Sequence, residues 1–228
     1  MEAIILAGGF GTRLRYVVPD LPKPMAPVNG KPFLEILFGS LARKDFTRVI
    51  LSLGYKADLI KSHFGSRFNG IEVDYVVEDQ PLGTGGAIRL AMEKVTKDHI
   101  FIFNGDTYLD LEAHEIEQDW LKNSRPKIIG REVLDTARYG RLIVEKSRVT
   151  GFSEKGASGP GLINAGCYVF SKNELNAFAP GAAFSVETDY LMQNVDKKHF
   201  DIFVTEGKFI DIGIPEDYAR AQIELKDL

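Results

Sequence analysis

The sequence predicts an α/β protein built around one mixed, mostly parallel central sheet. In the first hundred residues, short apolar runs typical of buried strands alternate with segments whose apolar residues have helical spacing. From about residue 127, strands follow one another directly, and the turn at Lys146-Ser147-Arg148 predicts an antiparallel hairpin. No linker rich in Ser, Pro or charge divides the halves, so we expect them to share the sheet.

The first half begins with the apolar run Ala3-Ile4-Ile5-Leu6, which predicts a buried strand. A helix is predicted over 31–41, because its apolar residues recur at a spacing of three and four. The further elements of this half are strand 48–53, helix 57–64, strand 71–77, a glycine-rich loop over 78–86, helix 87–95 and strand 99–103.

The second half is richer in strands. We expect strands at 128–133, 140–145, 149–153, 162–170, 201–205 and 209–212, and helices at 172–178, 186–195 and 215–225. Pro215 opens the last helix, since the first turn of a helix accepts proline. The segment 156–161, with three glycines and a proline, is interpreted as a loop that could cover a site.

Composition excludes several classes of function. The 228 residues carry a net charge of -4, which argues against a nucleic-acid partner. One cysteine, Cys167, allows no internal disulfide, and its strand-like surroundings predict a packed thiol. With no signal peptide and no apolar run of about 20 residues, we expect a cytoplasmic protein without membrane contact.

The stretch from Leu6 to Leu14 leads from the first strand into three glycines and Arg13, and Lys23 follows. Glycines let backbone N–H groups approach anionic oxygens closely, and the two cations add fixed charge. The pattern is neither a dinucleotide fingerprint, whose third glycine would fall at Leu14, nor a P-loop, because no Gly-Lys-Ser/Thr is present. The loop therefore predicts a phosphate site of another kind, against the alternative of a plain surface turn.

Three carboxylates follow predicted strands, where ligands bind at the edge of an open α/β sheet: Asp106, Glu154 and Asp211. Mg²⁺ is commonly held by one or two carboxylates together with phosphate oxygens and water, so Asp106 and Asp211 would suffice. Either aspartate alone could equally form a turn or a helix cap. Beside two phosphate-type loops, the metal interpretation is favoured.

These motifs resemble the sugar-1-phosphate nucleotidylyltransferases. The similarity covers most of the chain: Leu6 to Arg13, Lys23-Pro24, Leu82 to Gly85, Asn104 to Asp106, Glu154-Lys155, Asn164 to Gly166 and Asp211 to Gly213. It implies a Rossmann-like three-layer fold of the nucleotide-diphospho-sugar transferase type. The stretch Leu21 to Phe33 is most similar to small members that act on a heptose 1-phosphate.

The resemblance implies a reaction of a nucleoside triphosphate with a sugar 1-phosphate that gives a nucleotide sugar and pyrophosphate. Arg13 is then expected at the β- and γ-phosphates, Lys23 at the α-phosphate and Lys155 at the sugar phosphate. Asp106 and Asp211 are expected to bind the Mg²⁺. The nucleotide-binding set implied by the resemblance is Leu6, Ala7, Gly8, Gly9, Gly11, Thr12, Glu78, Gly83, Thr84 and Asp106.

Glu78 is the residue that bears on the base. A carboxylate only accepts hydrogen bonds, and guanine presents adjacent N1–H and N2–H₂ donors. Uracil presents one N3–H between two carbonyl oxygens, which glutamine suits better. Glu78 therefore favours GTP over UTP, unless it is a solvated acid at a strand end.

For the sugar, the resemblance indicates Gly140, Glu154, Asn164, Glu187 and Asp189. The last two could also be acids at a helix start, which the helix dipole favours. We expect one nucleotidyltransferase domain over 1–228, with nucleotide binding in about 1–110, sugar binding in about 111–228 and no appended β-helix. Two alternatives remain open, a uridylyltransferase on an amino-sugar or hexose 1-phosphate and an inactive nucleotide-sugar sensor. The oligomeric state, a homo-oligomer included, is also open.

Overall fold

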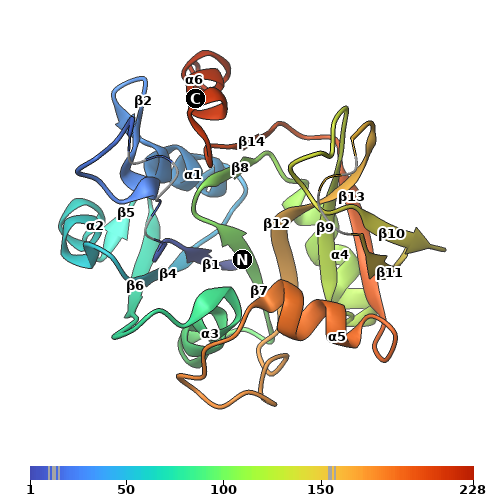
Figure 1. Cartoon of the computed structure of the whole chain (residues 1–228). Helices are drawn as coiled ribbons and strands as arrows, with labels where there is room; N and C mark the ends of the chain where they lie inside the picture. Colours follow the sequence, from blue (N-terminus) through green and yellow to red (C-terminus); the bar gives the residue numbers. More distant parts are fainter. Residues whose placement is uncertain (10, 12–13, 15, 154–155, 157) are drawn as a thin grey trace.

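The structure, a computed structural model, describes residues 1–9, 11, 14, 16–153, 156 and 158–228 (Figure 1). The strands of its first half are β1 (Glu2–Leu6), β2 (Pro27–Val28), β3 (Lys31–Pro32), β4 (Arg48–Leu53), β5 (Arg67–Phe68), β6 (Ile71–Val77), β7 (His99–Asn104) and β8 (Thr107–Leu109). Those of its second half are β9 (Lys127–Val133), β10 (Leu142–Glu145), β11 (Arg148–Phe152), β12 (Gly161–Ser171), β13 (Phe200–Thr205) and β14 (Phe209–Asp211).

The α-helices are α1 (Phe33–Ala42), α2 (Ala57–Phe64), α3 (Gly83–Ala91), α4 (Ala113–Asn123), α5 (Met192–Asn194) and α6 (Pro215–Glu224). The described residues also include the 3₁₀ turns η2 (Lys23–Met25) and η3 (Met92–Lys94) and the π-helix η4 (Val186–Leu191). Among the described residues, no helix combines the length and apolar character that crossing a membrane requires.

One ten-stranded sheet runs through both halves of the chain, in the order β10-β11-β13-β9-β12-β7-β1-β4-β6-β5. The four consecutive strands β7, β1, β4 and β6 run parallel to one another, with Ile5 paired to Leu51 and Phe103. The pairs that β12 forms with β7 and β9 are antiparallel. The mixed sheet expected from the sequence is confirmed, and it places the ends of β1, β4 and β7 side by side.

Helices cover both faces of the sheet, so the fold has three layers. Alternate residues of β1 point to opposite sides: Ile5 packs into a core with α1, α2, α4 and α6, and Ile4 packs into a second core with α3 and η4. Figure 1 shows α6 beside β2 on one side of the molecule and α3 near α5 on the other. The three-layer expectation is confirmed.

The hairpin predicted at residues 146–148 is confirmed. β10 pairs with β11 in antiparallel fashion, and Glu145 lies opposite Arg148. Lys146 and Ser147 between them have φ angles of 47° and 63°, so both central residues are left-handed, as a two-residue hairpin turn requires.

The helix predicted over 172–178 is wrong. The backbone there forms successive turns in which the N–H groups of Glu174, Asn176 and Phe178 each donate to the carbonyl oxygen three residues earlier. Leu175 and Phe178, also three residues apart, pack into the core, so this turn spacing buries both side chains without a regular helix.

The helix that follows the second glycine-rich loop starts earlier than predicted. We expected a loop over 78–86 and a helix over 87–95, whereas α3 already begins at Gly83 and ends at Ala91. Glycine is a poor helix former, so local preference alone would not begin a helix there. Packing of this turn against Phe184 overrides that preference. The helix predicted over 186–195 is present, but its first part has π geometry.

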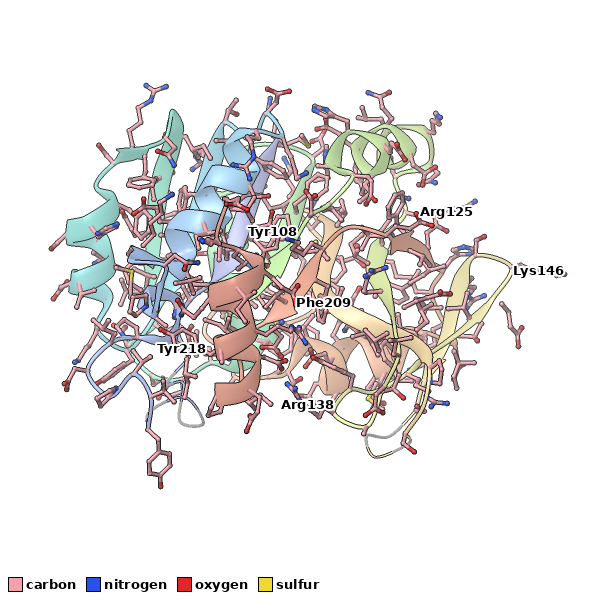
Figure 2. All side chains as sticks on the ribbon, turned by 90° about the horizontal axis from the view of Figure 1, so that it is seen from above. Tyr108, Arg125, Arg138, Lys146, Phe209 and Tyr218 are labelled. Carbon is pink, nitrogen blue, oxygen red and sulfur yellow. The ribbon has the colours of Figure 1, made fainter. Side chains whose placement is uncertain are left out.

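Helix α4 and strand β8 were left out of the sequence analysis. Helix α4 buries Ala113, Ile116 and Trp120, a helical spacing that was visible in the sequence. The short strand β8 pairs with β14, so that Asp211 lies opposite Thr107. Figure 2 shows the labelled Tyr108 and Phe209 of these two strands near α6. This small sheet brings the carboxyl end of β7 next to residue 211.

A buried lysine forms ion pairs with two other elements of the second half. Lys127 on β9 is only 1% exposed, and its Nζ donates to Asp119 Oδ2 of α4 at 2.6 Å and to Asp201 Oδ2 of β13 at 3.2 Å. An ammonium buried this deeply depends on its partners, because desolvation of an unpaired charge is costly.

Lys127→Met should therefore lower the free energy of unfolding by about 3 kcal/mol, because it leaves the two carboxylates without their shared cation. The matched control is Lys172→Met, whose ammonium is 3.9 Å from the exposed Asp98 and should matter by less than about 0.5 kcal/mol. Urea denaturation followed by circular dichroism measures both. A loss below about 1 kcal/mol for Lys127→Met would show that the network is not needed for stability.

Candidate active site

A cavity of about 600 Å³ opens at the carboxyl ends of β1, β4, β6 and β7. This is the edge at which ligands bind in open α/β sheets, and the volume suits a molecule of nucleotide size. Its lining comes from segments far apart in the chain. The lining residues are Leu6, Gly8, Gly9, Gly11, Lys23, Pro24, Gly54, Tyr55, Glu78, Asp79, Gln80, Pro81, Gly83, Thr84, Ala87, Asn104, Asp106 and Gly213.

Close approach of backbone segments shapes the floor of this cavity. A Cβ atom on Gly54 would lie 2.8 Å from the carbonyl oxygen of Gly8. A Cβ atom on Gly105 would lie 2.5 Å from the carbonyl oxygen of Leu6. Both distances are too short for real contacts, so the ends of β1, β4 and β7 can meet only because these positions lack side chains.

The second glycine loop is built into the start of α3. Gly83 has a φ of +70°, and the N–H groups of Gly85 and Gly86 both donate to the carbonyl oxygen of Phe184. Thr84 Oγ1 accepts a hydrogen bond from the Val186 N–H at 3.0 Å. The loop is thus fastened to the start of η4, and the N–H groups of Gly85 and Gly86 are already used within the protein.

Glu78 stands at the end of β6 with its carboxylate anchored. Its Oε2 atom accepts the Leu82 N–H at 2.9 Å, and a Cβ atom on Gly8 would lie 2.8 Å from its Oε1 atom. Burial raises the pKa of the Glu78 carboxyl, while the Leu82 hydrogen bond acts in the opposite direction. Gly8 therefore leaves the room that the Glu78 carboxylate occupies in the cavity wall.

Lys23, Asp106 and Asp211 form a charged cluster at the other part of the site. Lys23 Nζ lies 2.5 Å from Asp106 Oδ2 and 3.9 Å from Asp211 Oδ1. The Ile212 N–H donates to the carbonyl oxygen of Asp106 at 2.9 Å, which holds the two aspartates at neighbouring positions. Burial and the nearby charge of Asp106 raise the pKa of Asp211.

The donor set of this cluster fits a divalent cation. The two carboxylates already face one positively charged group, and oxygen ligands of this kind suit Mg²⁺ when phosphate and water complete the shell. Within the described ranges, no group of three or more His, Cys, Asp or Glu residues could hold a metal. Any metal bound here would therefore need ligands from a substrate or from water.

Two of the residues predicted for the sugar, Asn164 and Glu187, lie on β12 and η4. Asn164 Nδ2 donates to the Tyr168 hydroxyl at 2.8 Å, and that hydroxyl lies 3.4 Å from Glu187 Oε1. Gly166, next along β12, is packed against Asn104 of the cavity wall, since a Cβ atom there would lie 2.3 Å from Asn104 Nδ2. The structure thus brings Asn164 and Glu187 together beside the cavity.

Two other predicted sugar residues have different surroundings. Asp189 Oδ2 accepts the Ser185 N–H at 2.7 Å at the start of η4, which is the helix-start role that the sequence left as an alternative. Gly140 lies beside Ser153, because a Cβ atom on it would be 3.0 Å from the Ser153 carbonyl oxygen. Like Asn164 and Glu187, these two residues are not among those that line the cavity.

Ser158 and Gly159 of the predicted loop over 156–161 are bonded to residues 135–141. Arg141 Nη2 donates to the Ser158 carbonyl oxygen at 2.6 Å, and the Thr136 N–H donates to the Gly159 carbonyl oxygen at 3.0 Å. In the view of Figure 2, the labelled Arg138 of the same segment lies close to α6, whose Asp217 accepts a hydrogen bond from it. The role of this loop as a cover stays a prediction.

Four predicted site residues, Thr12, Arg13, Glu154 and Lys155, lie outside the described residues. Ala7 is buried beneath the cavity, and its N–H donates to the Ser52 carbonyl oxygen.

The sequence analysis missed several residues that line the cavity. Gly54 and Tyr55 follow β4 directly, so the strand-end argument used for Asp106 would have found them. Asn104 and Gly213 lay within recognised motifs, but were not assigned to the site.

Known proteins are similar to this chain over almost its whole length. A family model described as "Nucleotidyl transferase" matches residues 2–227. The chain is 42% identical over 227 residues to the D-glycero-alpha-D-manno-heptose 1-phosphate guanylyltransferase of Aneurinibacillus thermoaerophilus, covering 99% of both chains. It is 42% identical to the protein of the same name from Campylobacter jejuni, covering 96% of this chain and 97% of that one.

A solved structure is similar over nearly the whole chain. It is HddC from Yersinia pseudotuberculosis complexed with GMP-PN, with a TM-score of 0.88 and 41% sequence identity. The similarity covers 98% of this chain and 99% of that chain.

Gly83→Ala should weaken nucleotide binding about tenfold or more, because the new Cβ atom would lie 2.6 Å from the Phe184 carbonyl oxygen and push the loop from the cavity. Gly30→Ala is the matched control: Gly30 also has a positive φ, of +79°, but has open space around it and does not line the cavity. Isothermal titration calorimetry measures the affinity. Equal affinities in the two variants would contradict this role of Gly83.

Proposed function

The chain belongs to the nucleotidyl transferase family, and we propose that it transfers GMP from GTP to D-glycero-α-D-manno-heptose 1-phosphate, giving the GDP-sugar and pyrophosphate. The observation that carries this proposal is one cavity lined by an acceptor-only carboxylate, Glu78, and by Lys23 and Asp106, with Asp211 next to Lys23. Two heptose 1-phosphate guanylyltransferases similar over almost their whole length support the choice of substrates.

Recognition of the base is assigned to Glu78. Its Oε2 atom already accepts the Leu82 N–H, which fixes the orientation of the carboxylate. Each carboxylate oxygen can accept more than one hydrogen bond, so this anchor leaves room for the N1–H and N2–H₂ donors of guanine. An anchored acceptor needs little reorganisation when the base binds, which favours affinity for guanine over uracil.

The reaction needs no covalent enzyme intermediate. A phosphate oxygen of the sugar 1-phosphate attacks the α-phosphorus of GTP, and the bond from that phosphorus to the bridging oxygen of pyrophosphate breaks on the opposite side. The nucleophile is already an anion, so no general base is required. The barrier comes from repulsion between two polyanions, which fixed positive charges and correct orientation reduce.

We assign the reduction of this repulsion to the chain's own cations. Lys23 lines the cavity and is assigned to the α-phosphate. By resemblance to the family, Arg13 is assigned to the leaving pyrophosphate and Lys155 to the sugar phosphate. Asp106 and Asp211 are assigned to Mg²⁺, which would neutralise charge on the phosphate oxygens when bound.

Binding of the sugar is assigned to Asn164, Glu187, Gly140, Glu154 and Asp189, as the family resemblance implies. Of these, Asn164 and Glu187 share the Tyr168 hydroxyl, and Gly166, two residues after Asn164 on β12, packs against Asn104 of the cavity, which supports a sugar position next to the nucleotide. We treat 1–228 as one nucleotidyltransferase domain, with nucleotide binding in its first half and sugar binding in its second. A cytoplasmic location, where GTP is available, belongs to the same proposal.

The proposal is tested by pyrophosphate release with GTP, ATP, CTP, UTP and dTTP, each paired with D-glycero-α-D-manno-heptose, mannose and glucose 1-phosphates. We expect the highest kcat/KM for GTP with the heptose 1-phosphate. Preference for UTP or dTTP would overturn the guanine assignment, and preference for a hexose 1-phosphate would overturn the heptose. Nucleotide binding without pyrophosphate release from any pair would identify a sensor.

Glu78→Gln should lower the ratio of kcat/KM for GTP to that for UTP about tenfold or more, because an amide donor replaces one acceptor facing guanine. The amide oxygen can still accept the Leu82 N–H, so the fold should be kept. Glu72→Gln, an exposed acid on the same strand, removes an equal charge as a control. An unchanged ratio in Glu78→Gln would place base recognition on other groups.

A further inference from the structure

The Lys23 side chain lies between the carboxylates of Asp106 and Asp211, and two glycines leave the space for it. A Cβ atom on Gly11 would lie 2.9 Å from Lys23 Cβ, and one on Gly213 would lie 3.3 Å from Lys23 Nζ. The lysine side chain is only 11% exposed. In the described part of the chain, it is the only cationic side chain within 4.0 Å of Asp106 or Asp211.

This position conflicts with a divalent cation at the same carboxylates. Mg²⁺ bonds to carboxylate oxygens at about 2.0–2.1 Å. Lys23 Nζ lies 2.5 Å from Asp106 Oδ2, so a metal on that oxygen would be a close neighbour of the ammonium. Two positive charges at such short range repel each other strongly where water is partly excluded.

A second set of anions is within the reach of Lys23 when substrate is present. Lys23 lines the cavity assigned to the nucleoside triphosphate, together with Gly8, Gly9 and Gly11. Its ammonium sits on a flexible four-carbon stem, and it can exchange one anionic partner for another without movement of the backbone. The α-phosphate would therefore compete with Asp106 for this ammonium.

We propose that Lys23 holds the cation position between Asp106 and Asp211 in the nucleotide-free protein, and that a nucleoside triphosphate draws its ammonium onto the phosphates before a divalent cation binds. This inference rests on the proposed function for the places of the triphosphate and the metal. It makes nucleotide and metal binding mutually favourable, because each removes the contact that opposes the other. The metal site is then complete only when the nucleotide is in place.

The test is the affinity of the full-length, nucleotide-free protein for Mn²⁺ alone, measured by electron paramagnetic resonance. Lys23→Met should bind Mn²⁺ about tenfold or more tightly than wild type, because the competing charge is gone. Lys44→Met is the matched control, since Lys44 pairs with Asp110 at 2.6 Å away from the cavity and its loss changes the net charge equally. An equal or weaker affinity in Lys23→Met would overturn the proposal.

A second change locates the bound ion. In the Lys23→Met background, Asp211→Asn should abolish the gain in Mn²⁺ affinity, and a gain that survives would place the ion elsewhere and overturn the proposal. If Lys23→Met does not fold, Lys23→Gln removes the same charge and keeps a polar group.

A crystal structure of wild-type protein with a non-hydrolysable GTP analogue in the absence of metal gives an independent readout. We expect Lys23 Nζ on a phosphate oxygen, and an intact pair with Asp106 would overturn the exchange. The Mn²⁺ titration contains neither nucleotide nor sugar phosphate. A different preferred substrate would therefore defeat the proposed function and leave this result unchanged.

Discussion

The close meeting of backbone segments at the carboxyl edge of the sheet is the constraint on which the site depends. Gly8 and Gly54 touch across β1 and β4, and Gly105 touches the end of β1 from β7. Their missing side chains let three strands end together around one cavity, and they leave the space in which Glu78 stands. A side chain at any of these positions would separate the strands, and the cavity wall would lose its shape.

Charge compensation joins parts of the chain that are remote in sequence. Lys23, Asp106 and Asp211 come from three separate segments, and the pairing of β8 with β14 is what holds the two aspartates at one place. A site for two polyanionic substrates needs movable positive charge and fixed negative charge close together. The cluster supplies both, and so the ion pairs that hold Lys23, Asp106 and Asp211 together are also suited to the chemistry.

Prediction from sequence succeeded where local pattern and tertiary packing agree. Apolar runs gave the strands β1, β4 and β7, since a strand buried on both faces must be apolar throughout. It failed at Gly83, where contact with Phe184 begins a helix that local preference opposes, and at 172–178, where packing of Leu175 and Phe178 replaces a helix by turns. At Gly83 the deciding partner is about a hundred residues away in the chain, so no local window contains it.

The sequence by itself determined the mixed α/β sheet, the family, and the residue types of the site, because buried runs, glycines and strand-end carboxylates are local signals. Only the tertiary structure decided which of them meet. It placed Lys23 against Asp106, Glu78 beside Gly8, and Glu187 next to the Tyr168 hydroxyl. These contacts depend on how strands and helices pack across the sheet, and that packing is a property of the whole chain rather than of any motif.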